Sequence, residues 1–287
     1  MLQRAIDYWC NAFTPEMEQA WDRAIENQGL SIKVHRDGDG FCDAPSMIDR
    51  MDTCGFETLV VMASDIEPNA PINSFERVAY RPSEVEDLAL NHPGRFVGLW
   101  SIDPTTGDDG VQRAESMLAE SWCVGLHNHT HSWDRRFDHE DWTPYYRLAA
   151  AADVPFVMQA GASGGNFPHE CGHPSGIAEP AARHPSVRFV LSHTGAPWTT
   201  ETIEQARRFD NVFIGTATWS PRRWTDELID FAAGEGKGKV LYGSGFPTTG
   251  HNQMARQIAD RVADADVLEW LTATTARNVF TRLNQST

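Results

Sequence analysis

The sequence is short of positive charge and has no long hydrophobic segment. Lysine and arginine together number 24, against 40 aspartates and glutamates, which gives a formal net charge of −16 and a pI near 5.0. Such a chain repels nucleic-acid phosphates and anionic membrane surfaces. No apolar run approaches the roughly 20 residues that a membrane-spanning helix needs. We therefore expect a small-molecule partner, no nucleic-acid partner and no membrane partner.

Paired cysteines and a secretion signal are also missing. The five cysteines are scattered without a C-x-x-C pair, which argues against a disulfide framework and a structural zinc knuckle. The opening MLQRAIDYW lacks the apolar core and cleavage site of a signal peptide. These absences predict reduced thiols and a cytoplasmic location.

What the sequence does contain is a regular alternation of short apolar runs and longer helical patterns. The short runs are rich in β-branched and apolar residues, which predicts strands. Many of the segments between them end in the glycine or proline that stops a helix. The eight strand-like runs are 5–11, 56–63, 95–103, 123–130, 154–161, 187–193, 211–217 and 239–245.

Eight strand–helix units in a chain of this length are typical of an α/β protein with a (β/α)8 TIM barrel, and a doubly wound open sheet is the alternative. Without a linker or internal repeat, residues 1–287 are interpreted as a single barrel domain. The segment at about 28–44, rich in Gly and Asp, predicts an excursion over one barrel end. The acidic surface and barrel helices permit a homodimer.

Active sites of such barrels lie at the C-terminal ends of the strands, so polar residues ending the runs are candidates. Period-two alternation places Trp9 and Asn11 on one face of the first strand and Cys10 on the other. If Trp9 and Asn11 face the barrel interior, Cys10 packs against the helices and is not a nucleophile.

Several segments resemble a known family. MIDRMDTCGFETLVVMAS (47–64), NHPGRFVGLWSIDP (91–104), HPSVRFVLSHTGAPW (184–198), ELIDFAAGEGKGKVLYGSGFP (227–247) and TTARNVFTRL (274–283) carry the resemblance. They are similar to the amidohydrolase-related family that includes aminocarboxymuconate-semialdehyde decarboxylase and γ-resorcylate decarboxylase. The resemblance covers nearly the whole chain and implies an amidohydrolase-like barrel.

The resemblance also implies a metal site that this sequence lacks. Family members carry His-x-His on the first strand, histidines ending the fifth and sixth strands, and an aspartate ending the eighth, and bind one divalent metal with most of them. Here Trp9, Asn11, Gln159 and Gly245 stand at those positions, and only His193 remains. Indole and glycine offer no ligand, and amide oxygens are poor ligands for zinc. We expect no metal cofactor.

Histidines remain the main candidates for chemistry. The resemblance makes His193 a general acid/base, a role that imidazole suits near pH 7, although a satisfied histidine ending the sixth strand is the alternative. His127, His129 and His131 stand at alternate positions, and two of them could approach the pocket. With His193 or His169 they could instead build a relocated zinc or manganese site.

Loops at the same end add further candidates. Glu170, after the fifth strand, could act with His193 and His129 as a catalytic group. Arg222 or the adjacent Arg223, after the seventh strand, could clamp a substrate carboxylate. The residues expected to contact substrate are Trp9, Asn11, His127, Gln159, Trp219 and Arg222.

Three functions fit these sequence features. The first is a metal-independent hydrolase or lyase, possibly a decarboxylase, acting on a small unsaturated or aromatic, carboxylated substrate with His193 as general acid/base. The second is a metal-dependent hydrolase or decarboxylase with a relocated histidine site. The third is a non-catalytic ligand-binding barrel.

Overall fold

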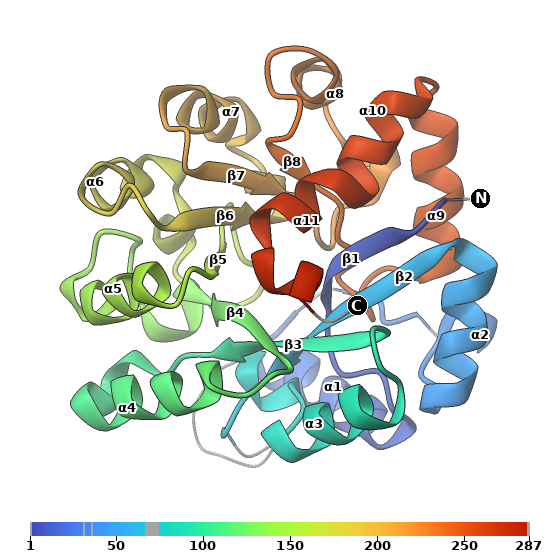
Figure 1. Cartoon of the computed structure of the whole chain (residues 1–287), viewed down its shortest axis with the longest axis horizontal. Helices are drawn as coiled ribbons and strands as arrows, with labels where there is room; N and C mark the ends of the chain where they lie inside the picture. The colour runs from blue at the N-terminus through green and yellow to red at the C-terminus, as the bar shows by residue number, and fades with distance from the viewer. Residues whose placement is uncertain (1, 31, 36, 67–74, 286–287) are drawn as a thin grey trace.

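Eight parallel strands form one sheet in chain order from β1 to β8 (Figure 1), which confirms the (β/α)8 barrel and rules out the open sheet. The computed structural model describes residues 2–30, 32–35, 37–66 and 75–285. Each predicted run contains one strand. The strands are β1 (Ala5–Cys10), β2 (Phe56–Ala63), β3 (Phe96–Ser101), β4 (Cys123–Asn128), β5 (Pro155–Gln159), β6 (Arg188–Ser192), β7 (Val212–Gly215) and β8 (Val240–Leu241).

The helices surround the strands, and local sequence signals set several of their ends. Asp43 caps its helix by accepting a hydrogen bond from the Ser46 N–H, and Gly55 ends the same helix at φ +88°. The helices are α1 (Pro15–Asn27), α2 (Ala44–Cys54), α3 (Pro82–Asn91), α4 (Gly107–Leu118), α5 (Thr143–Ala151), α6 (Ala178–Arg183), α7 (Thr199–Arg208), α8 (Asp226–Ala233), α9 (His251–Arg261), α10 (Ala265–Glu269) and α11 (Thr275–Val279).

The barrel closes between β1 and the segment that follows the short strand β8. The Tyr8 N–H donates to the Tyr242 carbonyl at 3.2 Å, and the Gly245 N–H donates to the Trp9 carbonyl at 2.8 Å. The Asn11 N–H donates to the Phe246 carbonyl at 3.1 Å. These bonds bring the ends of β1 and β8 together, so residues far apart in the sequence meet at one end of the barrel.

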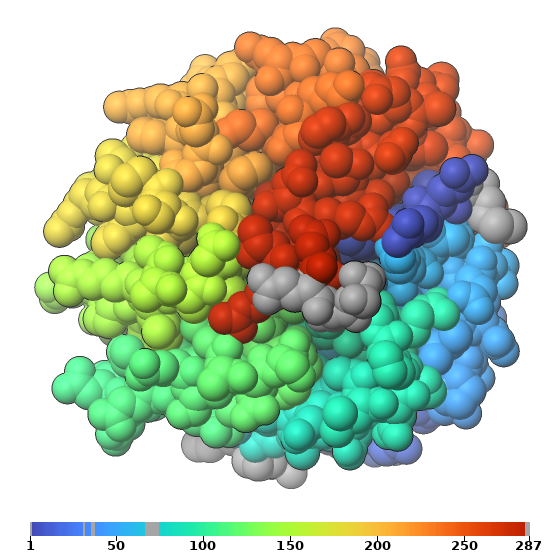
Figure 2. Space-filling view, viewed as in Figure 1, coloured from blue at the N-terminus to red at the C-terminus, as the bar shows by residue number. Residues whose placement is uncertain are grey.

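Side chains separate into an inner and an outer core, as alternation along the strands requires. Cys10 is fully buried in the cluster between barrel and helices, as predicted. Tyr8 and Trp9 both lie in the inner cluster, where strict alternation is broken by a register shift between Asp7 and Cys10 in the pairing of β1 with β2. The inner cluster ends against α11, where the Phe280 ring stacks on Tyr8 with centroids 6.5 Å apart. The C-terminal segment lies across the middle of this face (Figures 1 and 2). A ligand therefore has to enter from the other end.

The described residues of the excursion at 28–44 cross the end of the barrel at which a ligand would enter. The Asp39 carboxylate accepts the N–H groups of Asn252 and Gln253 at 3.2 Å each, at the start of α9. The His35 N–H donates to the Pro247 carbonyl at 2.7 Å. These contacts attach the excursion to the segment that follows β8.

All five cysteines are free thiols. Among the described residues no helix is both long and apolar enough to cross a membrane.

Candidate functional site

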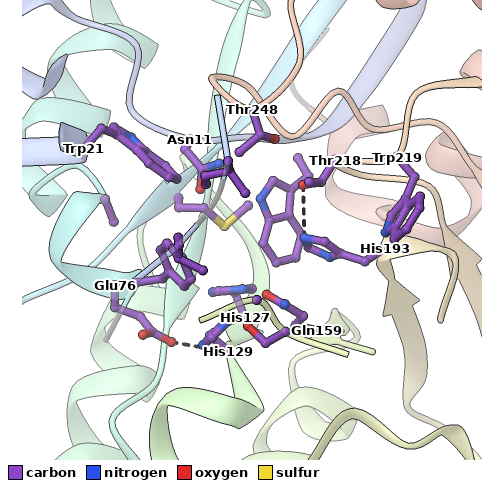
Figure 3. Close-up of a pocket in the computed structure, with 18 of the residues that line it drawn as sticks. Asn11, Trp21, Glu76, His127, His129, Gln159, His193, Thr218, Trp219 and Thr248 are labelled. Atoms are coloured by element: carbon purple, nitrogen blue, oxygen red, sulfur yellow. Dashed lines mark hydrogen bonds between the residues drawn. The ribbon is translucent and has the colours of Figure 1, made fainter. Parts of the chain in front are cut away.

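A cavity of about 250 Å³ lies at the C-terminal ends of the strands (Figure 3). Its walls are mostly aromatic and aliphatic, and many of its polar groups come from the ends of β1, β3, β4, β5 and β6 and from the loop after β7. The lining residues used below are Trp9, Asn11, Trp21, Phe75, Glu76, Ser101, His127, His129, Gln159, His193, Thr218, Trp219 and Arg223.

His193 follows the end of β6, and a hydroxyl group lies beside each of its ring nitrogens. Its Nδ1 lies 2.6 Å from Ser192 Oγ, and its Nε2 lies 3.0 Å from Thr218 Oγ1. Desolvation by the surrounding protein, with a smaller contribution from the nearby His131, lowers the pKa of His193 to about 3. The imidazole is therefore neutral at pH 7 and linked to a hydroxyl that faces the cavity.

Backbone conformations rare for residues with side chains gather around this pair. His193, Thr194 and Thr218 have φ values of +62°, +55° and +68°, and Gly245 has φ +67°. A Cβ atom at Gly245 would lie 2.3 Å from both the backbone nitrogen and Oγ1 of Thr218. The loops after β7 and β8 thus fit together without space for a side chain at position 245. Such strain is found most often at functional sites.

His127 and Trp9 form the part of the floor next to His193. His127 Nδ1 lies 2.8 Å from Ser101 Oγ, while its buried Nε2 has no hydrogen-bond partner among the described residues. The Trp9 ring meets the His127 and His193 rings edge to face, with centroids 4.5 and 5.2 Å apart. Burial lowers the pKa of His127 to about 3. Both histidines that touch Trp9 are therefore uncharged at neutral pH.

The other two histidines of the HNHTH run lie beyond the end of β4, where period-two alternation no longer applies. His129 lines the cavity, but its Nδ1 accepts the Ser132 N–H at 3.1 Å and caps a 3₁₀ turn. His131 turns away and donates its Nε2–H to the Gly161 carbonyl at 2.9 Å. Two of the three histidines reach the cavity, and His129 has a structural role there.

Two predicted site residues lie outside the cavity. Glu170 is exposed on a 3₁₀ turn (His169–Gly172) and does not line the cavity that holds His193. Arg222 and Arg223 are both exposed, but only Arg223 lines the cavity. Both arginines belong to a 3₁₀ turn, in which adjacent side chains point in different directions. The Arg223 guanidinium lies 5.3 Å from the centre of the Trp219 ring.

The residues at the family's metal positions do not fit a metal ion. Trp9 has no ligating lone pair, and no side chain fits at Gly245. The Asn11 amide nitrogen donates to the Phe246 carbonyl at 2.6 Å, and each ring nitrogen of His193 is hydrogen-bonded to a hydroxyl group. Gln159 lines the cavity as the remaining amide. This set provides neither the charge nor the imidazoles that zinc or manganese prefers.

The predicted relocated metal site has no geometric support either. In the described part of the chain, the only three potential ligands with atoms within 4.8 Å of one another are Asp7, Cys10 and His251. They lie in the layer between β1 and α9, outside the cavity, where Asp7 Oδ2 is 3.3 Å from His251 Nε2. His193 and His169 form no such group with the histidines of 127–131.

Several residues of the site were not among the predictions. Ser192 and Thr218 provide the hydroxyl groups beside His193, and Glu76 accepts the His129 backbone N–H at 3.0 Å within the cavity wall. The only signal in the sequence was a hydroxyl residue at the end of the sixth run and one just after the seventh. Glu76 precedes the third strand and gave no signal.

A closed (β/α)8 barrel with a polar cavity at the strand ends is the architecture of a large class of enzymes. Within that class, the chain belongs to the amidohydrolase family, because the family model described as Amidohydrolase matches residues 57–282. No functionally curated protein matches the sequence.

Solved structures share the fold over nearly the full length. An uncharacterised TIM-barrel protein from Bordetella bronchiseptica has a TM-score of 0.73 at 16% identity, with 98% of this chain and 99% of that chain covered. The 5-carboxyvanillate decarboxylase of Sphingomonas paucimobilis has a TM-score of 0.67 at 15% identity, with 98% of this chain and 99% of that chain covered. The 2,6-dihydroxybenzoate decarboxylase from Rhizobium has a TM-score of 0.67 at 15% identity, with the same coverage of both chains.

Proposed function

We propose that this protein is a metal-independent hydrolase or lyase that acts on a small, planar, unsaturated or aromatic carboxylated compound. The observation that carries the proposal is the neutral His193 imidazole, hydrogen-bonded to the Thr218 hydroxyl, in a cavity where Trp9 and Gly245 replace ligands of the family's metal. A neutral imidazole can accept and return a proton without a metal-bound water.

The shape and walls of the cavity support a planar ligand. A volume of about 250 Å³ suits a single substituted ring, and Trp9, Trp21, Phe75 and Trp219 supply aromatic surfaces. Arg223 offers a charge-assisted hydrogen bond to a carboxylate. Two solved neighbours were crystallised with substituted aromatic acids, one with 2,6-dihydroxybenzoate and one with manganese and 4-hydroxy-3-methoxy-5-nitrobenzoic acid.

The absence of a fitting metal site limits the chemistry to reactive substrates. A metal ion supplies several kcal/mol of charge stabilisation to a developing oxyanion. Here that stabilisation has to come from neutral donors on the cavity floor, such as the Gln159 amide and the His127 ring. Substrates with a good leaving group, a lactone ring or an electron-poor ring are therefore favoured.

A panel of aromatic carboxylates, aryl esters and lactones tests the proposal. The protein is dialysed against chelator and assayed with and without added zinc or manganese. We expect turnover of at least one compound, with a rate that neither metal raises. His193→Asn should lower kcat by about 100-fold or more, as the loss of a general acid/base does. His169→Asn, on the exposed turn outside the cavity, is the matched control.

Two outcomes would contradict the proposal. Turnover that appears only with stoichiometric metal would favour a metal-dependent enzyme. Tight binding of a panel compound without turnover would favour the ligand-binding barrel, which has its own support because both His193 ring nitrogens are already hydrogen-bonded.

A further inference from the structure

Thr218, His193 and Ser192 are arranged as a nucleophile, a base and an orienting group. Thr218 Oγ1 lies 3.0 Å from His193 Nε2, and the opposite ring nitrogen lies 2.6 Å from Ser192 Oγ. A hydroxyl within hydrogen-bond reach of an imidazole, itself oriented by a third group, is the signature of an activated nucleophile. Thr218 and His193 line the same cavity (Figure 3), whereas Ser192 is fully buried and does not line it.

The hydrogen bonds are consistent with one tautomer of His193. If Nδ1–H donates to Ser192 Oγ, the Nε2 lone pair is left to accept the Thr218 hydroxyl proton. Desolvation keeps the ring neutral, so the lone pair is available at neutral pH. This is the protonation state in which a histidine can activate a hydroxyl group.

The backbone holds the Thr218 hydroxyl in place. A φ of +68° is an outlier for a β-branched residue. The Thr218 N–H donates to the Ser244 carbonyl at 3.1 Å, and Gly245 packs so closely that no Cβ would fit between them. The loops after β7 and β8 thus fix a strained residue with its hydroxyl directed at His193. Strained backbone that the surroundings over-determine is typical of catalytic positions.

We propose that Thr218 is a covalent nucleophile activated by His193, and that the substrates are activated acyl compounds, namely aryl esters or lactones. This inference rests on the proposed function and deepens it. It replaces a metal-activated water with a side-chain hydroxyl in the first step of hydrolysis.

The reaction balances with water as the only co-reactant. Thr218 Oγ1 bonds to the acyl carbon while its proton passes to His193 Nε2. The acyl carbon–oxygen bond to the leaving group then breaks, and the leaving oxygen takes that proton. Water loses a proton to the same nitrogen and attacks the acyl carbon, which releases the carboxylic acid and restores the Thr218 hydroxyl.

Donors for the oxyanion line the same cavity. Gln159 places its amide there, and its side chain has no hydrogen-bond partner among the described residues. If His127 Nδ1 accepts the Ser101 hydroxyl, its Nε2–H is a second donor, buried and likewise without a partner in the described chain. Preorganised donors of this kind stabilise the charge that develops on the carbonyl oxygen.

The test uses 4-nitrophenyl acetate with the full-length protein. We expect a burst of 4-nitrophenolate close to one equivalent per chain, followed by slower turnover. Acid quenching during the burst should trap one acetyl group, which peptide fragmentation places on Thr218. Thr218→Val, of similar shape but without the hydroxyl, should lose the burst, the adduct and at least about 100-fold of the turnover.

Matched variants separate nucleophilic attack from folding. Thr218→Ser keeps a hydroxyl and should keep the adduct, so it remains informative if Thr218→Val does not fold. Thr53→Val, on the exposed face of α2, should leave burst and turnover unchanged.

Three outcomes would overturn the inference: a wild-type protein that neither hydrolyses nor retains the acetyl group, an adduct mapped elsewhere, or unimpaired turnover by Thr218→Val. The proposed function fails separately. If aromatic carboxylates or lactones are turned over without metal in a reaction that needs His193 but not Thr218, only the nucleophile assignment is lost.

Discussion

Gly245→Ala is the substitution that most directly tests how the site is built. Gly245 has φ +67°, a conformation that costs a residue with a side chain about 1–2 kcal/mol. The added Cβ would also lie 2.3 Å from the Thr218 nitrogen and Oγ1, and overpacking of this kind costs about 1–3 kcal/mol. We therefore expect the free energy of unfolding to fall by about 2–5 kcal/mol in total.

Gly94→Ala is the matched control. Gly94 has φ +77°, and no atom lies within 4 Å of the position its Cβ would take. Gly94→Ala should therefore lower the free energy of unfolding only by the cost of the positive φ, about 1–2 kcal/mol. Urea unfolding of both variants gives the comparison, and any activity of Gly245→Ala should also fall because Thr218 has to shift. Equal losses of stability in the two variants would refute the tight fit between the loops after β7 and β8.

Three further predictions concern charge. Burial lowers the pKa of His127 to about 3, so below pH 6.5 the unfolded chain binds a proton that the folded chain does not, and stability falls as the pH decreases. At pH 5 this histidine costs about 2 kcal/mol of stability. Urea unfolding of His127→Gln should therefore show a smaller loss of stability between pH 7 and pH 5 than the wild-type protein shows. Arg223→Ala should weaken binding of an aromatic carboxylate about 10-fold or more by calorimetry, whereas Arg222→Ala should not; a loss in both or in neither would contradict the Arg223 assignment. His251→Asn removes the imidazole that lies 3.3 Å from Oδ2 of the fully buried Asp7 and should cost about 3–5 kcal/mol; an unchanged melting temperature would show that this contact does not stabilise the fold.

The barrel was predictable because its signals are local and repeated. Each strand is a short run of apolar residues next to a helix with its own stop signal, and each of the eight predicted runs contains a strand. The sequence pattern also placed Trp9 and Asn11 toward the cavity and Cys10 among the helices, but it did not report the register shift between Asp7 and Cys10 that brings Tyr8 to the same side as Trp9. The loss of the family's metal ligands could likewise be read from residue identities, since tryptophan and glycine cannot ligate in any fold.

The partners of those residues depended on the tertiary structure. Thr218 meets His193 because β6 and β7 are adjacent and the loops after them have positive φ, which no sequence period reports. Arg223 instead of Arg222 lines the cavity, and His131 turns away from it, because 3₁₀ turns follow where the strand pattern has ended.

By itself the sequence determined the fold, the end of the barrel that carries the site and the absence of the usual metal ligands, because strand alternation and side-chain chemistry are local properties. The tertiary structure alone decided which hydroxyl lies beside His193, which arginine reaches the cavity and which carboxylate pairs with His251. Those contacts join segments far apart in the chain, and the closure of the barrel and the paths of its loops set their distances.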